Sequence, residues 1–140
     1  MTETVIVFAD GGSRGNPGPS AIGAVVIDPS TTPPTRLAAV SERIGVTTNN
    51  VAEYKALLLG LELARDLGAE EIEVINDSEL VARQIGGEYK VKHAGLKPLF
   101  IESMRALREF DSWAVRSVRR EQNERADELV NEALDEALSA

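Results

Sequence analysis

Cysteine is absent from the 140-residue sequence, and histidine occurs once, as His93. The lack of cysteine excludes a disulfide framework, a thiolate zinc site and a cysteine nucleophile. Any bound metal must therefore be held by oxygen ligands or by His93. Aromatic residues are also few, at 4%, but 43% of the residues are hydrophobic, and a chain of this length can then bury a core without cross-links. We expect one domain over residues 1–140.

Long apolar runs are missing as well. No stretch approaches the roughly 18 apolar residues that a membrane span needs, and the first residues lack the basic and apolar segments of a secretion signal. We therefore expect a cytoplasmic protein with no membrane partner. We also expect a monomer.

Positive charge is scarce. Fifteen basic against 23 acidic residues give a formal charge of −8, which disfavours nucleic-acid binding through bulk electrostatics. The acid is unevenly spread, however. Residues 121–140 are strongly acidic, whereas residues 90–97 contain three lysines and a histidine without any acid. A local basic patch is compatible with this distribution.

The pattern of apolar residues and turn formers predicts an α/β protein. β-branched residues and glycine- or proline-rich boundaries predict three strands, at residues 3–10, 21–28 and 35–45, with a loop at residues 11–19. Apolar positions at helical spacing predict a long helix at residues 50–67, which ends before Gly68. The remaining predicted elements are a strand at 71–76, helices at 78–86 and 96–110, a strand at 112–118 and a helix at 123–138.

Connection lengths predict how these strands pair. Short links join the first three strands, which favours an antiparallel meander, and a long helix returns the fourth strand parallel to the first. We expect a five-stranded mixed sheet, with the first three strands antiparallel, the last two parallel and helices on its faces. Asp10 ends the first predicted strand and Asp77 follows the fourth, so both carboxylates should meet at one edge of the sheet.

Two further carboxylates can reach the same edge, because Glu53 and Asp127 stand in the first turns of predicted helices. Four clustered carboxylates repel one another unless they are protonated or bind cations. Ligation by oxygen alone favours Mg²⁺ or Mn²⁺, and two such ions suit in-line displacement at a phosphodiester.

Each carboxylate also has a purely structural interpretation. Glu53 stands three residues after Asn50, which is the spacing of a capping box. Asp77 could be the N-cap of the next helix, Asp127 could complement a helix dipole, and Asp10 could be a turn former. No single one of the four establishes a site.

Taken in order, four segments around these acids resemble the type 1 ribonuclease H family. The ordered set is far more specific than any one piece, and the resemblance extends from residue 5 to about residue 138. The segments are Phe8-Ala9-Asp10-Gly11-Gly12-Ser13 with Asn16-Pro17-Gly18 beyond it, Thr48-Asn49-Asn50-Val51-Ala52-Glu53-Tyr54, Asn76-Asp77-Ser78, and Asn123-Glu124-Arg125-Ala126-Asp127-Glu128-Leu129.

The resemblance implies a ribonuclease H-like fold and an endonuclease that hydrolyses the RNA strand of RNA/DNA hybrids. It assigns two Mg²⁺ ions, with Mn²⁺ as a substitute, to Asp10, Glu53, Asp77 and Asp127. These ions activate water and stabilise the leaving 3′ oxygen, so the products carry 5′-phosphate and 3′-hydroxyl ends. Double-stranded RNA is a second candidate substrate.

Selective cutting of RNA requires a contact with the 2′-hydroxyl, which is both a donor and an acceptor. Asparagine amides can fill both roles. The alternative is that these residues only build loops and helix caps. By resemblance, the substrate-binding residues are Gly11, Ser13, Asn16, Thr48, Asn49 and Asn50.

The sequence departs from the family pattern in two places. Many members have a histidine in the loop before the last carboxylate, and here Arg119 or Arg120 is the candidate to assist product release; a solvated pair is the alternative. The chain also resembles the subset that lacks a long basic protrusion after Gly86. Its short lysine run is either a smaller substitute or a solvated loop.

Two other functions remain open at this point. One is another nuclease of the same broad fold, such as an exonuclease or a strand-transfer enzyme, although the asparagine-containing segments resemble these less. The other is an inactive module that binds hybrid or RNA. An intact set of four acids disfavours a pure binder, because acids facing phosphates weaken binding.

Overall fold

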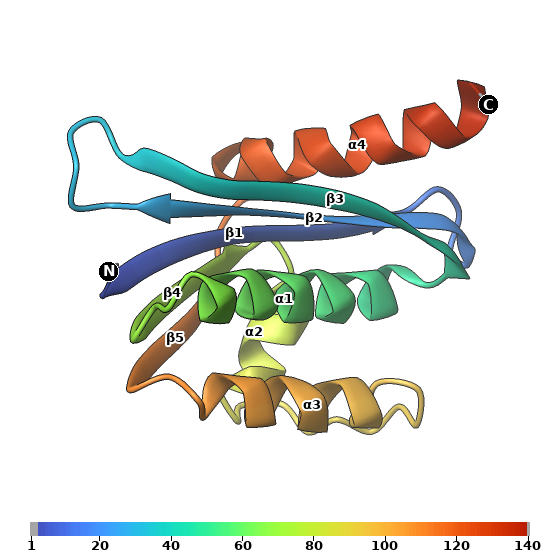
Figure 1. Ribbon diagram of the computed structural model, residues 1–140. Coiled ribbons are helices and arrows are strands. Elements are labelled where there is room, and N and C mark those ends of the chain that lie inside the picture. The colour runs from blue at the N-terminus through green and yellow to red at the C-terminus, as the bar shows by residue number, and fades with distance from the viewer. Residues whose placement is uncertain (1–2, 140) are drawn as a thin grey trace.

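The computed structural model describes residues 3–139, with side chains up to residue 135. Within that range the chain forms five strands, four α-helices and a short 3₁₀ helix (Figure 1). Their order is β1 (Thr4–Ser13), β2 (Gly18–Asp28), β3 (Thr35–Thr47), α1 (Asn49–Asp66), β4 (Glu71–Asn76), α2 (Glu79–Ile85), α3 (Lys97–Leu107), β5 (Ser112–Ser117), η1 (Arg120–Asn123) and α4 (Glu124–Ser139).

The strands form one mixed sheet in the order β3-β2-β1-β4-β5. β2 pairs antiparallel with both β1 and β3, whereas β4 pairs parallel with both β1 and β5. The predicted five-stranded mixed sheet is thus confirmed. A strand that joins a sheet parallel to its neighbour needs a long crossover connection. For β4, which pairs parallel with β1, the crossover is α1, between β3 and β4 in the chain.

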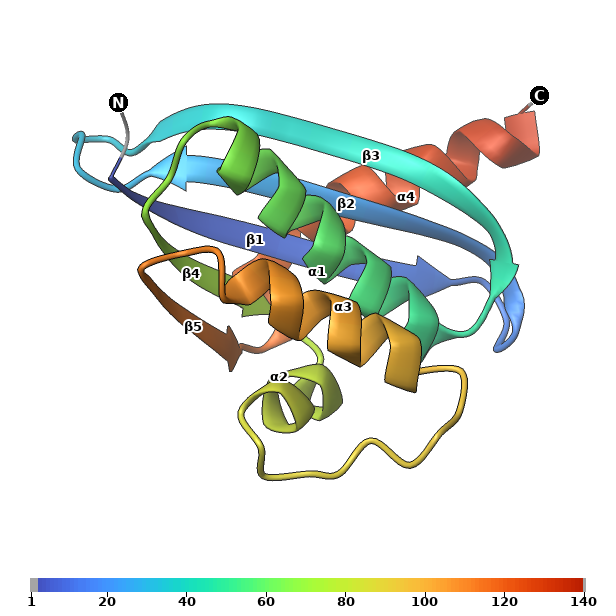
Figure 2. The same cartoon turned by 60° about the horizontal axis from the view of Figure 1, so that its bottom comes forward.

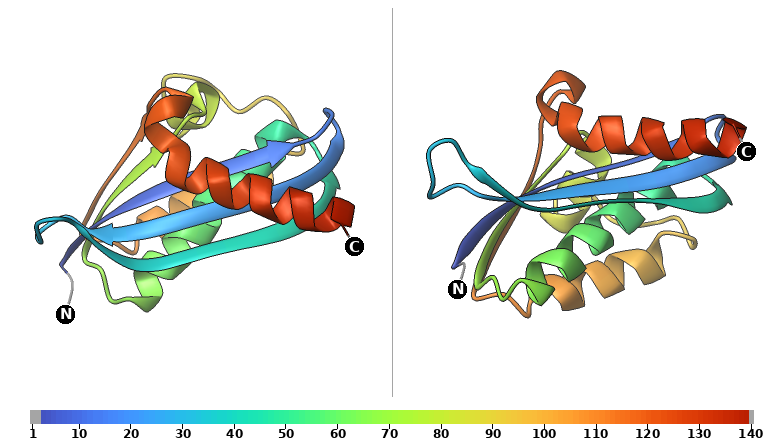
Figure 3. Two further views of the ribbon diagram at one scale, coloured as in Figure 1. Left: turned by 90° about the horizontal axis from the view of Figure 1, so that it is seen from above. Right: turned by 45° about the horizontal axis from the view of Figure 1, so that its top comes forward.

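Helices cover both faces of the sheet. α4 lies across β1, β2 and β3 on one face, and α1 packs on β1 and β2 on the other, with α3 stacked on α1 (Figures 1 and 2). The main core lies between the sheet and α1, where Val5 and Val7 of β1 meet Leu57 and Leu61 of α1. A smaller apolar cluster fixes α4 on its face (Figure 3). No helix within residues 3–139 is long and apolar enough to cross a membrane.

The glycine segment after Asp10 is strand rather than the predicted loop. β1 continues to Ser13 and β2 begins at Gly18, because the antiparallel ladder runs through the pair Gly11↔Ile22 and on to Ser13↔Ser20. Cross-strand pairing here overrides the low strand propensity of glycine. Asp10 therefore lies inside β1, two residues beyond its last pairing with β4 at Phe8.

The segment before the last helix also differs from the prediction. Part of the expected loop, Arg120–Asn123, is a 3₁₀ turn that leads directly into α4. Such turns often precede α-helices. As a result the side chain of Arg120 is held near the end of β4 rather than on a free loop.

Candidate active site

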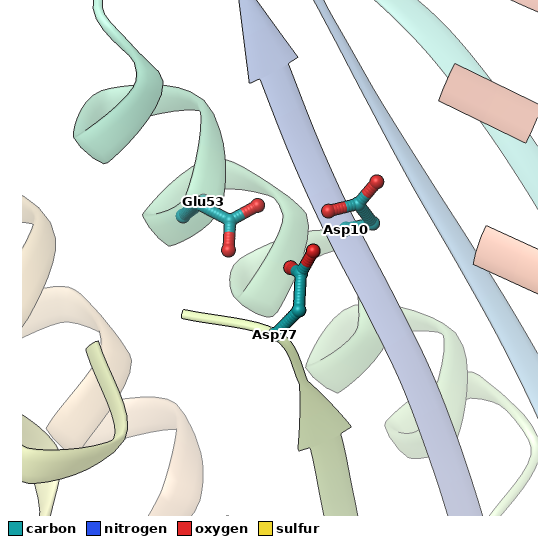
Figure 4. Close-up of side chains that lie close together, drawn as sticks. All are labelled: Asp10, Glu53 and Asp77. Carbon is teal, nitrogen blue, oxygen red and sulfur yellow. The ribbon is translucent and has the colours of Figure 1, made fainter. Parts of the chain in front are cut away.

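Asp10, Glu53 and Asp77 converge on one point. One carboxylate oxygen from each lies within 4.8 Å of those of the other two (Figure 4). Asp10 comes from β1 and is only 3% exposed, Glu53 comes from the first turns of α1, and Asp77 directly follows β4. Three segments far apart in the sequence thus place acids at the end of the parallel strand pair.

The structural alternatives for three of these acids are wrong. The N-cap of α1 is Thr48, whose Oγ1 accepts a hydrogen bond from the Val51 amide at 3.3 Å, so Asn50 and Glu53 form no capping box. The N-cap of α2 is Ser78 rather than Asp77. Asp10 lies in a strand and not in a turn. Asp127 does stand in the first turn of α4, where it also complements the helix dipole.

Glu53 is held by the backbone of β1. Its Oε1 accepts a hydrogen bond from the Gly11 amide, which ties the start of α1 to the strand that carries Asp10. A Cβ on Gly11 would lie 2.2 Å from the backbone C and O of Ala52. Only glycine allows α1 and β1 to approach this closely.

Crowding of the acids changes their protonation. Burial, followed by the charge of Glu53, raises the pKa of Asp10 to about 10. Burial, followed by the charge of Asp77, raises the pKa of Glu53 to about 8, although the bond from the Gly11 amide acts in the opposite direction. Without a cation, this group therefore holds protons at neutral pH.

These shifts predict that the metal-free protein becomes less stable as the pH rises. The folded state binds the protons of Asp10 and Glu53 more tightly than the unfolded chain does, so their contribution is full below about pH 4. It is lost as the pH rises toward about 8 to 10. Between about pH 5 and 8 we expect the free energy of unfolding to fall by up to about 1.4 kcal/mol per pH unit for each of the two acids.

Urea unfolding in EDTA across this pH range measures the effect. Asp10→Asn should flatten the pH dependence, and saturating Mg²⁺ should remove most of it, because a bound cation favours the ionised carboxylates. Equal stability at both ends of the range would show that these acids ionise freely in the folded protein.

The three acids lie in a cleft of about 360 Å³. Asp127 lines the same cleft without joining the close group, and its Oδ2 accepts a bond from Asn131 at 3.4 Å. Arg120 also lines the cleft, and its Nε lies 3.4 Å from Oδ2 of Asp77. Three of the predicted carboxylates therefore meet directly, and the fourth faces the same space.

Most of the predicted substrate-binding residues surround this cleft. Gly11, Ser13, Asn49 and Asn50 line it. Oδ1 of Asn49 accepts the Ser13 amide at 2.9 Å, which links β1 to the start of α1.

Asn16 and Thr48 lie outside the lining of the cleft. Asn16 holds the backbone of Asn49, because its Oδ1 accepts a hydrogen bond of 3.1 Å from the backbone N–H of Asn49. Thr48 caps α1 instead. These two positions therefore organise the wall of the cleft.

The two arginines before α4 differ in position. Both side chains are exposed, but Arg120 lines the cleft and reaches Asp77, whereas Arg119 is not part of the cleft lining. His93 is also exposed, in the loop between α2 and α3. Of the two candidates, only Arg120 stands beside the carboxylates.

Sequence reasoning missed three polar residues of the cleft, Arg14, Ser78 and Asn131. Arg14 pairs with Asp135 at 2.6 Å across the gap between the β1–β2 turn and α4. Asn131 could have been found from its spacing, because residues four apart share a helix face and it follows Asp127 by four. Arg14 carries no such signal, since only the packing of α4 brings it to the cleft.

The residues of the cleft suit a hard divalent cation. Every donor in the close group is a carboxylate oxygen, which is the ligand type that Mg²⁺ and Mn²⁺ prefer. The raised pKa values of Asp10 and Glu53 mark uncompensated negative charge that a cation would neutralise. The site therefore fits a metal chemically as well as geometrically.

Solved structures share the fold of this chain. The crystal structure of RNase H1 from Halobacterium salinarum has a TM-score of 0.90 and 41% identity, covering 95% of this chain and 98% of that one. LC11-RNase H1, in complex with an RNA/DNA hybrid, has a TM-score of 0.88 and 45% identity over 96% of this chain and 99% of that chain. The fold and the site define a protein of the ribonuclease H-like class.

Sequence comparison identifies the family. A family model described as "Reverse transcriptase-like" matches residues 8–133. The chain is 42% identical to "Ribonuclease HI" of Halobacterium salinarum over 95% of its own length and 65% of that protein. It is 46% identical to "Bifunctional protein Rv2228c" of Mycobacterium tuberculosis over 97% of its own length, but only 37% of that protein. The chain belongs to the type 1 ribonuclease H family.

Proposed function

We propose that this chain is an endonuclease that hydrolyses the RNA strand of RNA/DNA hybrids. The observation that carries the proposal is the group of Asp10, Glu53 and Asp77, whose oxygens lie within 4.8 Å of one another in an open cleft. The relative LC11-RNase H1 binds an RNA/DNA hybrid and has nearly the same fold, which supports this substrate class.

We propose that Asp10, Glu53, Asp77 and Asp127 hold two Mg²⁺ ions, with Mn²⁺ able to substitute. When bound, such ions lower the pKa of water and stabilise charge on the attacking and leaving oxygens of a phosphodiester. The acids of the chain supply the negative charge that retains the cations, and β1, α1 and the end of β4 hold that charge in place before substrate arrives. Hydrolysis of this kind leaves 5′-phosphate and 3′-hydroxyl ends.

Choice of the RNA strand is proposed to depend on the polar wall beside the acids. Ser13, Asn49 and Asn50 offer donors and acceptors at the cleft, which is what recognition of a 2′-hydroxyl requires. Gly11 has no side chain, so the backbone of β1 can lie close to α1 at the cleft. Asn16 and Thr48 hold the start of α1, which forms this wall, in position. Double-stranded RNA offers the same hydroxyls and is a second candidate substrate.

We further propose that the protein acts as a monomer in the cytoplasm. A single chain carries all four of the carboxylates that are proposed to hold the ions. The absence of cysteine makes the fold independent of an oxidising compartment.

A cleavage assay with four substrates tests the function. End-labelled RNA/DNA hybrid, duplex RNA, single-stranded RNA and duplex DNA are incubated with Mg²⁺, and the products are resolved on a gel. Internal cuts confined to the RNA strand of the hybrid support the proposal. Stepwise loss from one end would favour an exonuclease, and binding without cleavage would favour an inactive module.

Arg120 provides a further prediction, on turnover. Its guanidinium lies beside Asp77, where it can pair with the newly formed 5′-phosphate and assist product departure. Arg120→Ala should lower steady-state kcat by about 10-fold, or roughly 1.4 kcal/mol, with a smaller effect on a single turnover. The contribution should not titrate between about pH 6 and 9, because arginine stays protonated throughout that range.

Arg119→Ala is the matched control, because Arg119 is adjacent in sequence and equally an exposed arginine, but lies outside the cleft lining. It should leave both rates within about twofold of the unmodified protein. An equal loss of kcat and of the single-turnover rate in Arg120→Ala would place this arginine in bond breaking instead of product release.

A further inference from the structure

Asn123 opens the Asn-x-x-x-Asp segment, and no step above uses it. It is the last residue of η1 and only 1% exposed. Its Nδ2 donates a hydrogen bond of 2.9 Å to the carbonyl oxygen of Ala9, 114 residues away in sequence. Ala9 directly precedes Asp10, so this bond joins the approach to α4 to the strand that carries the most buried acid of the site.

A second bond holds the other end of the same segment. The amide of Val118 donates to the carbonyl oxygen of Asn76 at 2.7 Å, and Asn76 directly precedes Asp77. Residues 118–123 are therefore attached at both ends to the backbone next to a clustered carboxylate. Arg120 lies between the two attachments, and Asp127 follows Asn123 by four residues along the chain.

The environment of Asn123 does not suit a residue selected for stability alone. Its Oδ1 is buried without a hydrogen-bond partner among the described residues. Reversing the amide would turn Oδ1 toward the Ala9 carbonyl and lose the only bond that the side chain makes, so the orientation is determined. An unpaired buried acceptor is unfavourable, and an apolar side chain would avoid it.

We propose that Asn123 is a positioning residue that fixes Arg120 and Asp127 relative to the group of Asp10, Glu53 and Asp77. The inference rests on the proposed function. Asn123 does not line the cleft and so acts through the residues that do. The three clustered acids stand on β1, α1 and the end of β4, which strand pairing and the core beneath α1 hold together. The bond from Asn123 to the Ala9 carbonyl is one side-chain contact added to that framework, so the three acids keep their places without it.

Asn123→Leu tests the proposal, because leucine has a similar size but cannot donate to Ala9. Steady-state kcat for hybrid cleavage should fall by about 10-fold or more, with a much smaller change in KM. In a double-mutant cycle, adding Arg120→Ala should cost less than it does in the unmodified protein, because the arginine is already misplaced. Fully multiplicative losses, or near-normal kcat in Asn123→Leu, would overturn the proposal.

Hydrogen exchange of the metal-free protein gives a readout that does not depend on activity. In Asn123→Leu, peptides covering residues 118–127 should exchange faster, whereas peptides from β1, α1 and β4 should not change. Faster exchange throughout the chain would indicate a general loss of stability and would also overturn the proposal.

Ser103→Ala is the control for removal of a buried polar group. Ser103 is fully buried on α3, where its Oγ donates to the Leu99 carbonyl at 2.7 Å, and it lies outside the cleft lining. This variant should leave kcat and the exchange of residues 118–127 unchanged. If the unmodified protein failed to cleave any hybrid, the proposed function would fail, while the exchange experiment would still decide the role of Asn123.

Discussion

Asp10→Asn and Asp77→Asn are each expected to lower kcat for hybrid cleavage by about 10³-fold or more, equal to roughly 4 kcal/mol of transition-state stabilisation. Each substitution removes one negative charge from the close group while keeping the size and shape of the side chain. The cations that the acids are proposed to retain would then bind more weakly and in a changed arrangement. Steady-state cleavage at saturating Mg²⁺ measures the effect.

The same substitutions should not unfold the protein. Asp10 is buried beside two other acids and holds a proton in the metal-free state at neutral pH. An asparagine of the same size is neutral without taking up a proton, so the melting temperature should be unchanged or slightly raised. Asp111→Asn is the matched control, since Asp111 is exposed and outside the cleft lining. Near-normal kcat in Asp10→Asn or Asp77→Asn would remove that residue from the proposed site.

Gly11→Ala is expected to have the second large effect, on both stability and activity. The added Cβ would lie 2.2 Å from the backbone C and O of Ala52 and 2.6 Å from the amide nitrogen of Glu53. Backbone atoms cannot rotate away as a side chain can, so α1 must move off β1. We expect a loss of about 3 kcal/mol or more in the free energy of unfolding.

The shift of α1 should also displace Glu53, because its carboxylate is bonded to the Gly11 amide. Activity should therefore fall by about 10²-fold even at temperatures where the variant is folded. Gly12→Ala provides the comparison, since its Cβ would meet only the Cγ1 atom of Val130, at 3.3 Å. Urea unfolding together with kcat separates the two variants. Similar stability in both would show that the contact between α1 and β1 is not tight.

Most of the fold could be predicted from the sequence because its signals are local. β-branched runs, helical spacing and turn residues were sufficient to predict the five strands and four α-helices, and connection lengths predicted which strands run parallel. The missed features depend on distant partners. The glycine segment Gly11–Ser13 is strand only because β2 pairs with it, and the 3₁₀ turn before α4 is held by bonds to Ala9 and Asn76.

For the site, the sequence by itself determined which acids are available and that any metal among them must be an oxygen-binding one, since cysteine is absent and the single histidine lies elsewhere. Taken singly, each acid kept both a structural and a functional interpretation, and the ordered resemblance to the type 1 ribonuclease H family favoured the functional one. The tertiary structure excludes the cap interpretations of Glu53 and Asp77, because hydrogen bonds show that Thr48 and Ser78 cap the helices and leave Glu53 and Asp77 to face Asp10. The structure also shows that Arg120, and not Arg119, contacts Asp77. The sequence alone could not separate these two adjacent arginines. The reason is physical: spacing along the chain determines which face a residue occupies, but repulsion, pKa shifts and ion pairing depend on distances that exist only after β1, α1, β4 and η1 have packed together.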